Sequence, residues 1–182
     1  MLSLMLQLVP TLWQPSETNI ANAVELKMRV MPWHCDPNMH INNGKYLSIM
    51  DLGRGQLFVR HGLMKKIMRH KFKVVVGAAH ILYRRSIPIG RRFTLRSQFI
   101  GVNERFIVLQ QGFIYGTQIA ALAYVNVAFS ANSGLVTPSD VCAALEIDFH
   151  ALPVLPEVGH KAWETDKALL ERMSELNLES IG

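Results

Sequence analysis

The sequence has few cysteines and no apolar run long enough to cross a membrane. Its 182 residues include two cysteines, Cys35 and Cys142, far apart in the chain, which argues against a disulfide framework and a four-ligand zinc site. The two most apolar stretches, residues 1–13 and 119–129, are shorter than the roughly 18 residues of a spanning helix. Residues 1–13 also lack the basic start and small-residue cleavage site of a signal peptide. We therefore expect a cytoplasmic protein with no membrane span.

The amino-acid composition argues against a disordered chain. Hydrophobic residues make up 49% of the chain and charged residues 18%, which is enough apolar material for a packed core. At roughly 150 residues per domain, the length predicts one domain with an appended tail. We place an N-terminal arm at residues 1–22, the main domain at 23–135 and a C-terminal helical extension at 136–182.

Acidic residues are absent from the whole of residues 52–103, a stretch that holds twelve of the nineteen Lys and Arg. From Asp140 to the end of the chain the balance reverses, with nine acids against three bases. A basic middle favours a polyanionic partner such as a nucleotide or a phosphopantetheine carrier. The structural alternative is that the acidic tail folds back over the basic middle. The basic stretch lacks a recognition-helix pattern and interleaved aromatics, so we do not expect nucleic-acid binding.

Residues 106–139 contain no Asp, Glu, Lys, Arg or His. Their pattern predicts two long strands, joined at residues 115–118, with apolar side chains on both faces. In so short a chain, a helix can cover one face and a second subunit the other. We therefore expect a homo-oligomer, either a dimer or a dimer of dimers.

The remaining periodicities predict an α+β fold. Alternation at 23–31 indicates a half-buried strand, a turn-rich loop follows at 32–43, and helical spacing begins at Gly44 and ends near Arg60. Four further strands are predicted at 74–86, 92–102, 106–115 and 118–130, then a short helix and an amphipathic helix near 165–176. Short turns between consecutive strands predict a five-stranded antiparallel sheet with the long helix packed on it. Gly53 and Gly55 each cost the helix about 1 kcal/mol, so we expect a close neighbour on that face.

The most informative stretch is Asp36-Pro-Asn38-Met-His40-Ile-Asn42-Asn43-Gly44-Lys-Tyr46. It brings a carboxylate, an amide and an imidazole to the start of the long helix, where unsatisfied N–H groups and the helix dipole favour negative charge. Such donors can polarise a carbonyl oxygen during acyl transfer. Asp36 is suited to act as nucleophile or as the base for a water, and His40 to move a proton.

This stretch resembles the motif of hotdog-fold acyl thioesterases of the 4-hydroxybenzoyl-CoA thioesterase-like family, and its Asn-containing form is similar to that of plant acyl-carrier-protein thioesterases. The resemblance runs from about residue 24 to 130. It implies a sheet wrapped around a central helix, a homodimer, and active sites between subunits. By this resemblance Asp36 is the catalytic carboxylate, His40 and Asn38 lie beside it, and the helix turn at Asn43 binds the thioester carbonyl. His34 and Met39 stand where many relatives have Asp and Gly.

The substrate-binding prediction includes six residues: Asn42, Asn43, Gly44, Tyr46, Arg84 and Arg85. Each has a plainer alternative: the asparagines as helix caps, and the arginines as solvated strand ends. Cys35 could act as a thiolate but fits a small buried side chain better. Ligand spacing around His34 is irregular, so we expect no metal, and no other cofactor. Asp51 and Arg54, three residues apart, are interpreted as a surface pair.

The sequence therefore predicts an acyl-CoA thioesterase that releases a carboxylate and a free thiol. The alternatives are an acyl-carrier-protein thioesterase, since an acidic carrier also suits the basic middle, and a non-catalytic hotdog protein that binds acyl thioesters.

Overall fold

The computed structural model describes residue 17 and residues 19–179, with side chains up to residue 174. Most of the predicted N-terminal arm, including the apolar residues 1–13, lies outside the described residues. The described elements are β1 (Val24–Arg29), α2 (Asn43–Arg60), α3 (Leu63–Arg69), β2 (Lys73–Tyr83), β3 (Arg92–Val102), β4 (Ile107–Tyr115), β5 (Gln118–Ala131), β6 (Gly134–Val136), α4 (Pro138–Leu145) and α5 (Glu157–Glu179), with short 3-10 turns at Pro32–His34 and Phe149–Ala151. None of the described helices is both long and apolar enough to cross a bilayer.

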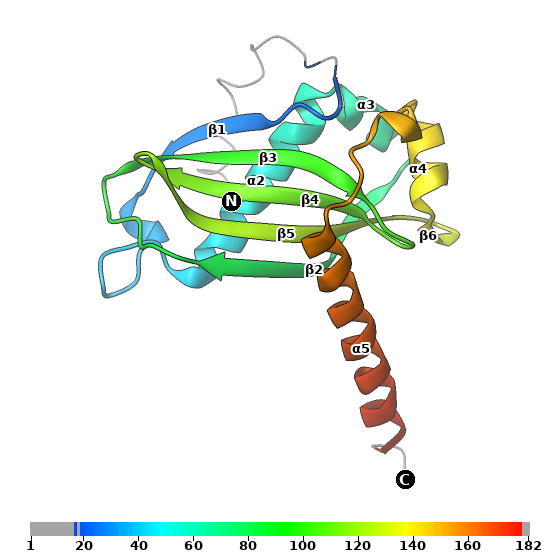
Figure 1. Cartoon of the computed structure of the whole chain (residues 1–182). Coiled ribbons are helices and arrows are strands. Elements are labelled where there is room, and N and C mark those ends of the chain that lie inside the picture. Colours follow the sequence, from blue (N-terminus) through cyan, green and yellow to red (C-terminus); the bar gives the residue numbers. More distant parts are fainter. Residues whose placement is uncertain (1–16, 18, 180–182) are drawn as a thin grey trace.

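The strands form one antiparallel sheet in the order β1-β3-β4-β5-β2, which confirms the predicted α+β fold. The three-residue β6 lies off this five-stranded path and pairs with the end of β5, and it is too short to show a period in the sequence. The sheet curls around α2, which lies along its concave face (Figure 1). The strand bounds agree with the predicted ones within three residues.

Helix α2 approaches the sheet closely at Gly53, one of the two glycines in its interior. A Cβ on Gly53 would lie 2.5 Å from Leu95 Cδ2 and 2.8 Å from Ser97 Oγ, so only glycine fits. Gly55 has nothing within 4 Å, and there the expectation of a close neighbour was wrong. Glycine at that position therefore has no packing reason within the described residues.

The predicted pair of Asp51 and Arg54 forms, and Asp51 lies at the surface with its side chain 67% exposed, but the expectation that Arg54 is also at the surface was wrong. Arg54 is buried between α2 and the sheet, where its guanidinium donates to Gln111 Oε1 at 2.9 Å and to the Asp51 carboxylate. Burial lowers the pKa of Arg54 to about 10, which leaves it charged at neutral pH. The sequence separation is typical of an exposed pair on one helix, and only the sheet across from it makes the position internal.

The C-terminal helix α5 covers part of the convex face of the sheet. Asp166 is buried there, with Asn126 Nδ2 donating to it at 2.6 Å and His80 Nε2 2.9 Å away, and Trp163 packs edge-on against Phe106. The convex face of the sheet is therefore covered in part by α5 of the same chain, whereas the sequence pattern suggested that a second subunit would cover it. Two acids of the C-terminal stretch contact residues of the basic stretch 52–103. Glu146 forms an ion pair with Lys66, and Asp166 lies 2.9 Å from His80.

Candidate active site

The loop before α2 is a tight hairpin. The Asp36 N–H donates to the carbonyl of His40 at 3.1 Å, and the Met39 N–H donates to the carbonyl of Asp36 at 3.0 Å. Closing this turn places Met39 at φ 60°, in the left-handed region that favours glycine. Met39 is 55% exposed, so its side chain contributes little packing at this turn. The neighbouring Ile87–Ile89 segment holds the loop through hydrogen bonds to Ile41 and Met39.

Asp36 and His40 face one another across this hairpin. Asp36 Oδ1 accepts the Asn38 N–H at 2.9 Å and lies 3.6 Å from His40 Nδ1. The Asp36 side chain is 17% exposed and that of His40 29%, so both are partly shielded yet open to a ligand. The arrangement supplies a carboxylate and an imidazole side by side, as proton transfer or nucleophilic attack requires.

The N-terminus of α2 lies directly behind this pair. Asn42 is the N-cap: its Oδ1 accepts the Gly44 N–H at 2.9 Å, and its own N–H donates to the carbonyl of His34 at 2.9 Å. Among the described residues the N–H of Asn43, the first of the helix, has no acceptor. An N–H at a helix start is suited to bind a carbonyl oxygen that gains negative charge.

A small cavity of about 170 Å³ opens beside this helix start. It is lined by His40, Ile41, Asn43, Tyr46, Tyr83, Arg84, Arg85 and Ser86. The Tyr83 hydroxyl donates to the carbonyl of Asn43 at 3.2 Å, and its ring meets that of Tyr46 edge-on at 5.1 Å. Burial, and then the neighbouring Tyr83, raises the pKa of Tyr46 to about 12. Tyr46 is therefore a neutral wall of the cavity and no candidate for a base.

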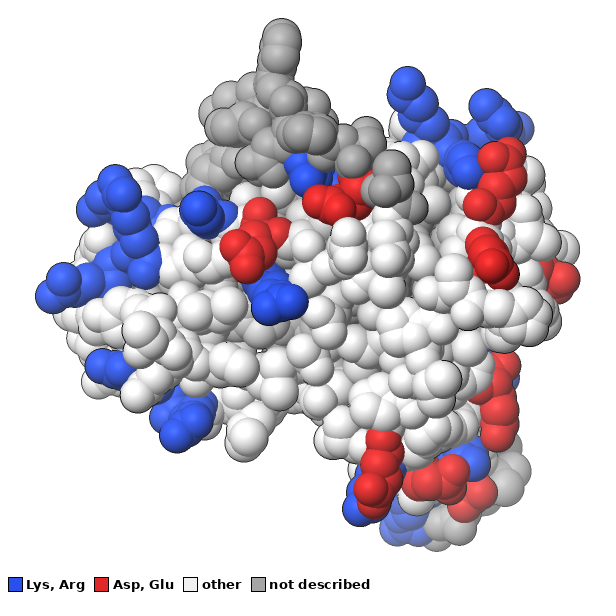
Figure 2. All heavy atoms as spheres, turned by 45° about the horizontal axis from the view of Figure 1, so that its top comes forward, with Lys and Arg blue, Asp and Glu red and all other residues white. Residues whose placement is uncertain are grey.

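Two arginines, Arg84 and Arg85, line one side of the cavity. The backbone N–H groups of Arg84 and Arg85 both donate to the carbonyl of Ala120, and the Arg85 guanidinium lies 5.2 Å from the centre of the Tyr115 ring. Figure 2 shows Lys and Arg side chains gathered at this end of the molecule, where β2 ends and β3 begins in Figure 1. Arg84, Arg85, Arg91, Arg92 and Arg96 are exposed, and none forms an ion pair with another described residue.

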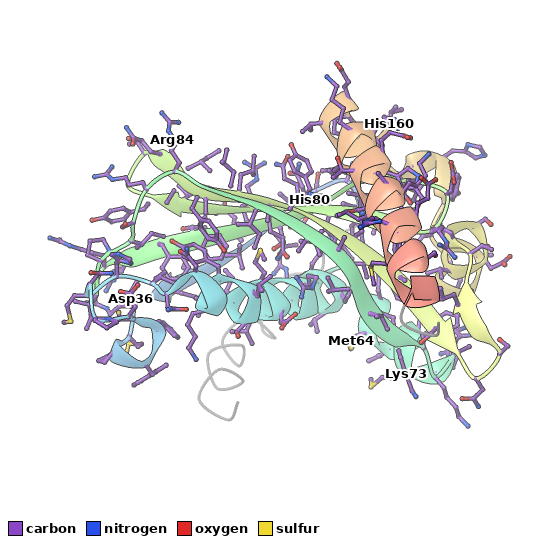
Figure 3. The ribbon with its side chains drawn as sticks, turned by 90° about the horizontal axis from the view of Figure 1, so that it is seen from below. Asp36, Met64, Lys73, His80, Arg84 and His160 are labelled. Carbon is purple, nitrogen blue, oxygen red and sulfur yellow. The ribbon has the colours of Figure 1, made fainter. Side chains whose placement is uncertain are left out.

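The predicted site residues separate into two groups. His40, Asn43, Tyr46, Arg84 and Arg85 line the cavity, and Figure 3 shows Asp36 and Arg84 at the same end of the molecule. Asp36 lies next to the cavity, against His40, while Asn38, Asn42 and Gly44 shape the loop through backbone N–H groups and the helix cap. The sequence reasoning missed Tyr83 and Ser86, although Tyr83 directly precedes the two predicted arginines.

His34 and Cys35, the two residues before Asp36, hold the start of the loop through hydrogen bonds to Met31. His34 is buried, and its Nδ1 accepts the Met31 N–H at 3.1 Å; burial, and then the charge of Lys45, lowers its pKa. The Cys35 thiol donates to the carbonyl of Met31, and burial, followed by the charge of Asp36, raises its pKa. Cys35 is therefore a poor nucleophile. Among the described residues, no group of three His, Cys, Asp or Glu could hold a metal ion.

The chain belongs to the thioesterase-like superfamily, whose family model matches residues 30–158. Curated relatives include Protein THEM6 of Danio rerio, 36% identical over 86 residues, and Protein THEM6 of Drosophila melanogaster, 33% identical over 75 residues. These matches cover 47% and 41% of this chain, and 43% and 39% of the two relatives, so less than half of each relative is matched.

Solved structures confirm the hotdog fold. YbaW, a probable thioesterase from Escherichia coli, has a TM-score of 0.57 at 22% identity, covering 68% of this chain and 96% of that one. A mutant 4-hydroxybenzoyl CoA thioesterase complexed with 4-hydroxybenzoyl CoA has a TM-score of 0.61 at 14% identity, covering 69% and 99%. A hypothetical protein from Staphylococcus aureus, in complex with CoA, has a TM-score of 0.62 at 16% identity, covering 78% and 94%.

Proposed function

We propose that this protein hydrolyses an acyl-CoA thioester to a free carboxylate and CoA. The observation that carries the proposal is the Asp36 carboxylate, 3.6 Å from His40 Nδ1 and next to a cavity lined by Asn43 at the start of α2. The Asn43 N–H would bind the thioester carbonyl oxygen and stabilise the charge that develops there. Asp36 would attack the carbonyl carbon, or take a proton from an attacking water, and His40 would assist the proton transfer.

The arginines beside the cavity favour a substrate whose acyl group is attached to a phosphate-bearing thiol carrier. Arg84 and Arg85 line the cavity, are exposed and form no ion pair with another described residue, so their guanidinium groups suit the phosphates of CoA. The same charge would also suit an acidic acyl carrier protein, which is the second candidate substrate. Comparing turnover of one acyl group on CoA and on a carrier protein separates the two.

We also propose that two copies of the chain pair through β2. Within the described residues β2 pairs only with β5, so its other edge is open, and Val74, Val75 and Val76 on it are 38%, 44% and 41% exposed. Open edges with apolar side chains readily accept another strand. The cavity lies just beyond the end of β2, at Tyr83, Arg84 and Arg85, so a second copy would lie beside it.

The test is release of free thiol from short, long and aromatic acyl-CoAs by the wild type and by Asp36→Asn. The variant keeps an oxygen for the Asn38 N–H but removes the ionised carboxylate. We expect a loss of at least about a hundredfold in kcat, which is about 2.7 kcal/mol of transition-state stabilisation.

Asp148→Asn is a matched control, because Asp148 likewise accepts the N–H two residues on, from His150 at 2.9 Å. It should leave turnover unchanged. Binding of acyl-CoA without any turnover by the wild type would favour a non-catalytic acyl-thioester-binding protein. Unchanged turnover in Asp36→Asn would exclude the mechanism.

A further inference from the structure

The side of α2 that faces the sheet is packed along its length. Ile49, Met50 and Leu57 on this side are 1%, 0% and 0% exposed, so no channel wide enough for water reaches them. Figure 3 shows side chains in the layer between the helix and the sheet. Within the described chain, an acyl group held at Asp36 therefore has no open path along the apolar side of α2.

Helix and sheet come closest at the middle of α2. A Cβ on Gly53 would lie 2.5 Å from Leu95 Cδ2 and 2.8 Å from Ser97 Oγ, so the two layers are in contact there. Next to this contact the buried guanidinium of Arg54 donates to Gln111 Oε1 at 2.9 Å. A methylene chain passing this point would have to separate the layers and leave a buried charged donor without its acceptor, which is costly. The middle of the helix is therefore closed to an acyl chain.

Aromatic rings close the inner end of the cavity at the start of α2. Tyr46, a lining residue, is buried, and its ring meets that of Phe113 edge-on at 4.6 Å. Phe113 in turn stacks on Phe93 at 5.7 Å. The cavity therefore ends at Tyr46 and does not continue into the core. A second copy beside β2 would cover the cavity from outside and leave this inner end unchanged.

The volume of the cavity limits what it can hold. It measures about 170 Å³. A protein cavity of about 150 Å³ binds one benzene molecule, which has six carbon atoms. Ile41, Tyr46 and Tyr83 supply the largest apolar side chains of the lining, and an acyl group would lie against them. Arg84 and Arg85 would face the phosphate-bearing end of the substrate.

We propose that the substrates carry short acyl groups of up to about six carbon atoms, and that Tyr46 sets this limit. The inference rests on the proposed hydrolysis of an acyl thioester. With the carbonyl oxygen at the Asn43 N–H, the acyl group enters the cavity and its far end meets the Tyr46 ring. A longer chain leaves its end in water or displaces buried rings, so its extra methylenes add nothing to transition-state binding.

Hydrolysis of straight-chain acyl-CoAs from acetyl to dodecanoyl tests the limit. The wild-type kcat/KM should be highest at or below hexanoyl-CoA and at least about tenfold lower for decanoyl-CoA. Tyr46→Leu removes the ring at the inner end and should raise the decanoyl-to-butyryl ratio of kcat/KM at least about tenfold. Tyr46→Phe keeps the ring and removes only the hydroxyl, so this matched control should keep the wild-type optimum.

Two further variants separate chain-length preference from loss of stability. Phe113→Leu opens the same inner end from the sheet, and it should shift the optimum in the same direction even if Tyr46→Leu does not fold. Phe58→Leu removes a buried ring near the other end of α2 and should leave the optimum unchanged. An equal shift in Phe58→Leu would contradict the role of Tyr46.

Binding distinguishes failure of this inference from failure of the proposed activity. The same CoA esters are titrated into Asp36→Asn protein in a calorimeter, and Kd should be lowest at or below hexanoyl-CoA. Preference for decanoyl- or dodecanoyl-CoA in turnover or binding would overturn the size limit and leave thioester hydrolysis intact. Binding of short esters without wild-type turnover would support the limit and overturn the hydrolysis. Binding of none of the esters would overturn both.

Discussion

The hydroxyl of Tyr83 donates a hydrogen bond to the backbone carbonyl of Asn43 across 3.2 Å, which joins the end of β2 to the first turn of α2. The two residues are forty positions apart in sequence. Because Asn43 also offers its N–H at the cavity, Tyr83 orients the peptide group next to the proposed carbonyl-binding donor. We therefore regard Tyr83 as a positioning residue of the site.

Tyr83→Phe should reduce kcat/KM for the best acyl-CoA by about three- to tenfold, since one partly exposed hydrogen bond contributes about 1 kcal/mol. The ring contact with Tyr46 remains, so urea denaturation should show little change in stability. Tyr124→Phe, a half-buried tyrosine on the convex face, is the control. Equal losses in both variants would contradict a role for Tyr83 in the site.

Met39→Gly should stabilise the protein by about 0.5–1 kcal/mol, because Met39 holds a left-handed backbone conformation at φ 60°. Lys45→Gly, at an exposed position inside α2, should instead destabilise by about 1 kcal/mol. Urea titration of both variants measures the difference. Destabilisation by Met39→Gly would mean that contacts of the Met39 side chain contribute more to stability than the strain of its backbone conformation removes.

The two interior glycines of α2, Gly53 and Gly55, should respond to alanine with opposite signs. At Gly53 the new Cβ would meet Leu95, Ser97 and Gln111 within 3 Å, so Gly53→Ala should destabilise by about 1–3 kcal/mol. Gly55→Ala meets nothing within 4 Å and should stabilise by up to about 1 kcal/mol. Thermal or chemical denaturation of the two variants checks this, and equal effects would rule out close packing at Gly53.

Stability should fall as the pH drops below the ordinary histidine pKa of about 6.5. Burial lowers the pKa of both His34 and His61, so the unfolded chain binds protons that the folded chain resists. This contribution is fully present above the unfolded pKa and is lost as the pH falls through the folded pKa. Protonated His34 would also lose its Nδ1 as acceptor for the Met31 N–H.

Free energies of unfolding measured between pH 7.5 and 5 check this. His34→Asn should have a shallower pH dependence than the wild type, with His61 accounting for part of the remaining slope. An identical slope in the variant would show that His34 contributes nothing to the pH dependence.

Much of the site could be predicted because it is local. Asp36, Asn38, His40 and Asn42 lie within seven residues, and hydrogen bonds between near neighbours build their loop and helix cap. The Asx turn, the N-cap and the tight turn follow rules that depend on short stretches of sequence. The positive φ at Met39 was missed, because methionine gives no signal for that conformation.

Short-range patterns in the sequence are enough to predict the strand and helix periods, the chemistry of the loop and the uneven charge. The contacts between groups far apart in the chain depend on the folded arrangement: Tyr83 with Asn43, Arg54 with Gln111, and Asp166 with His80. A charged residue such as Arg54, three positions from an acid on one helix, gives the same sequence pattern whether its side chain is exposed or buried. Burial depends on which strand lies opposite, and sheet order and register set that over the whole chain.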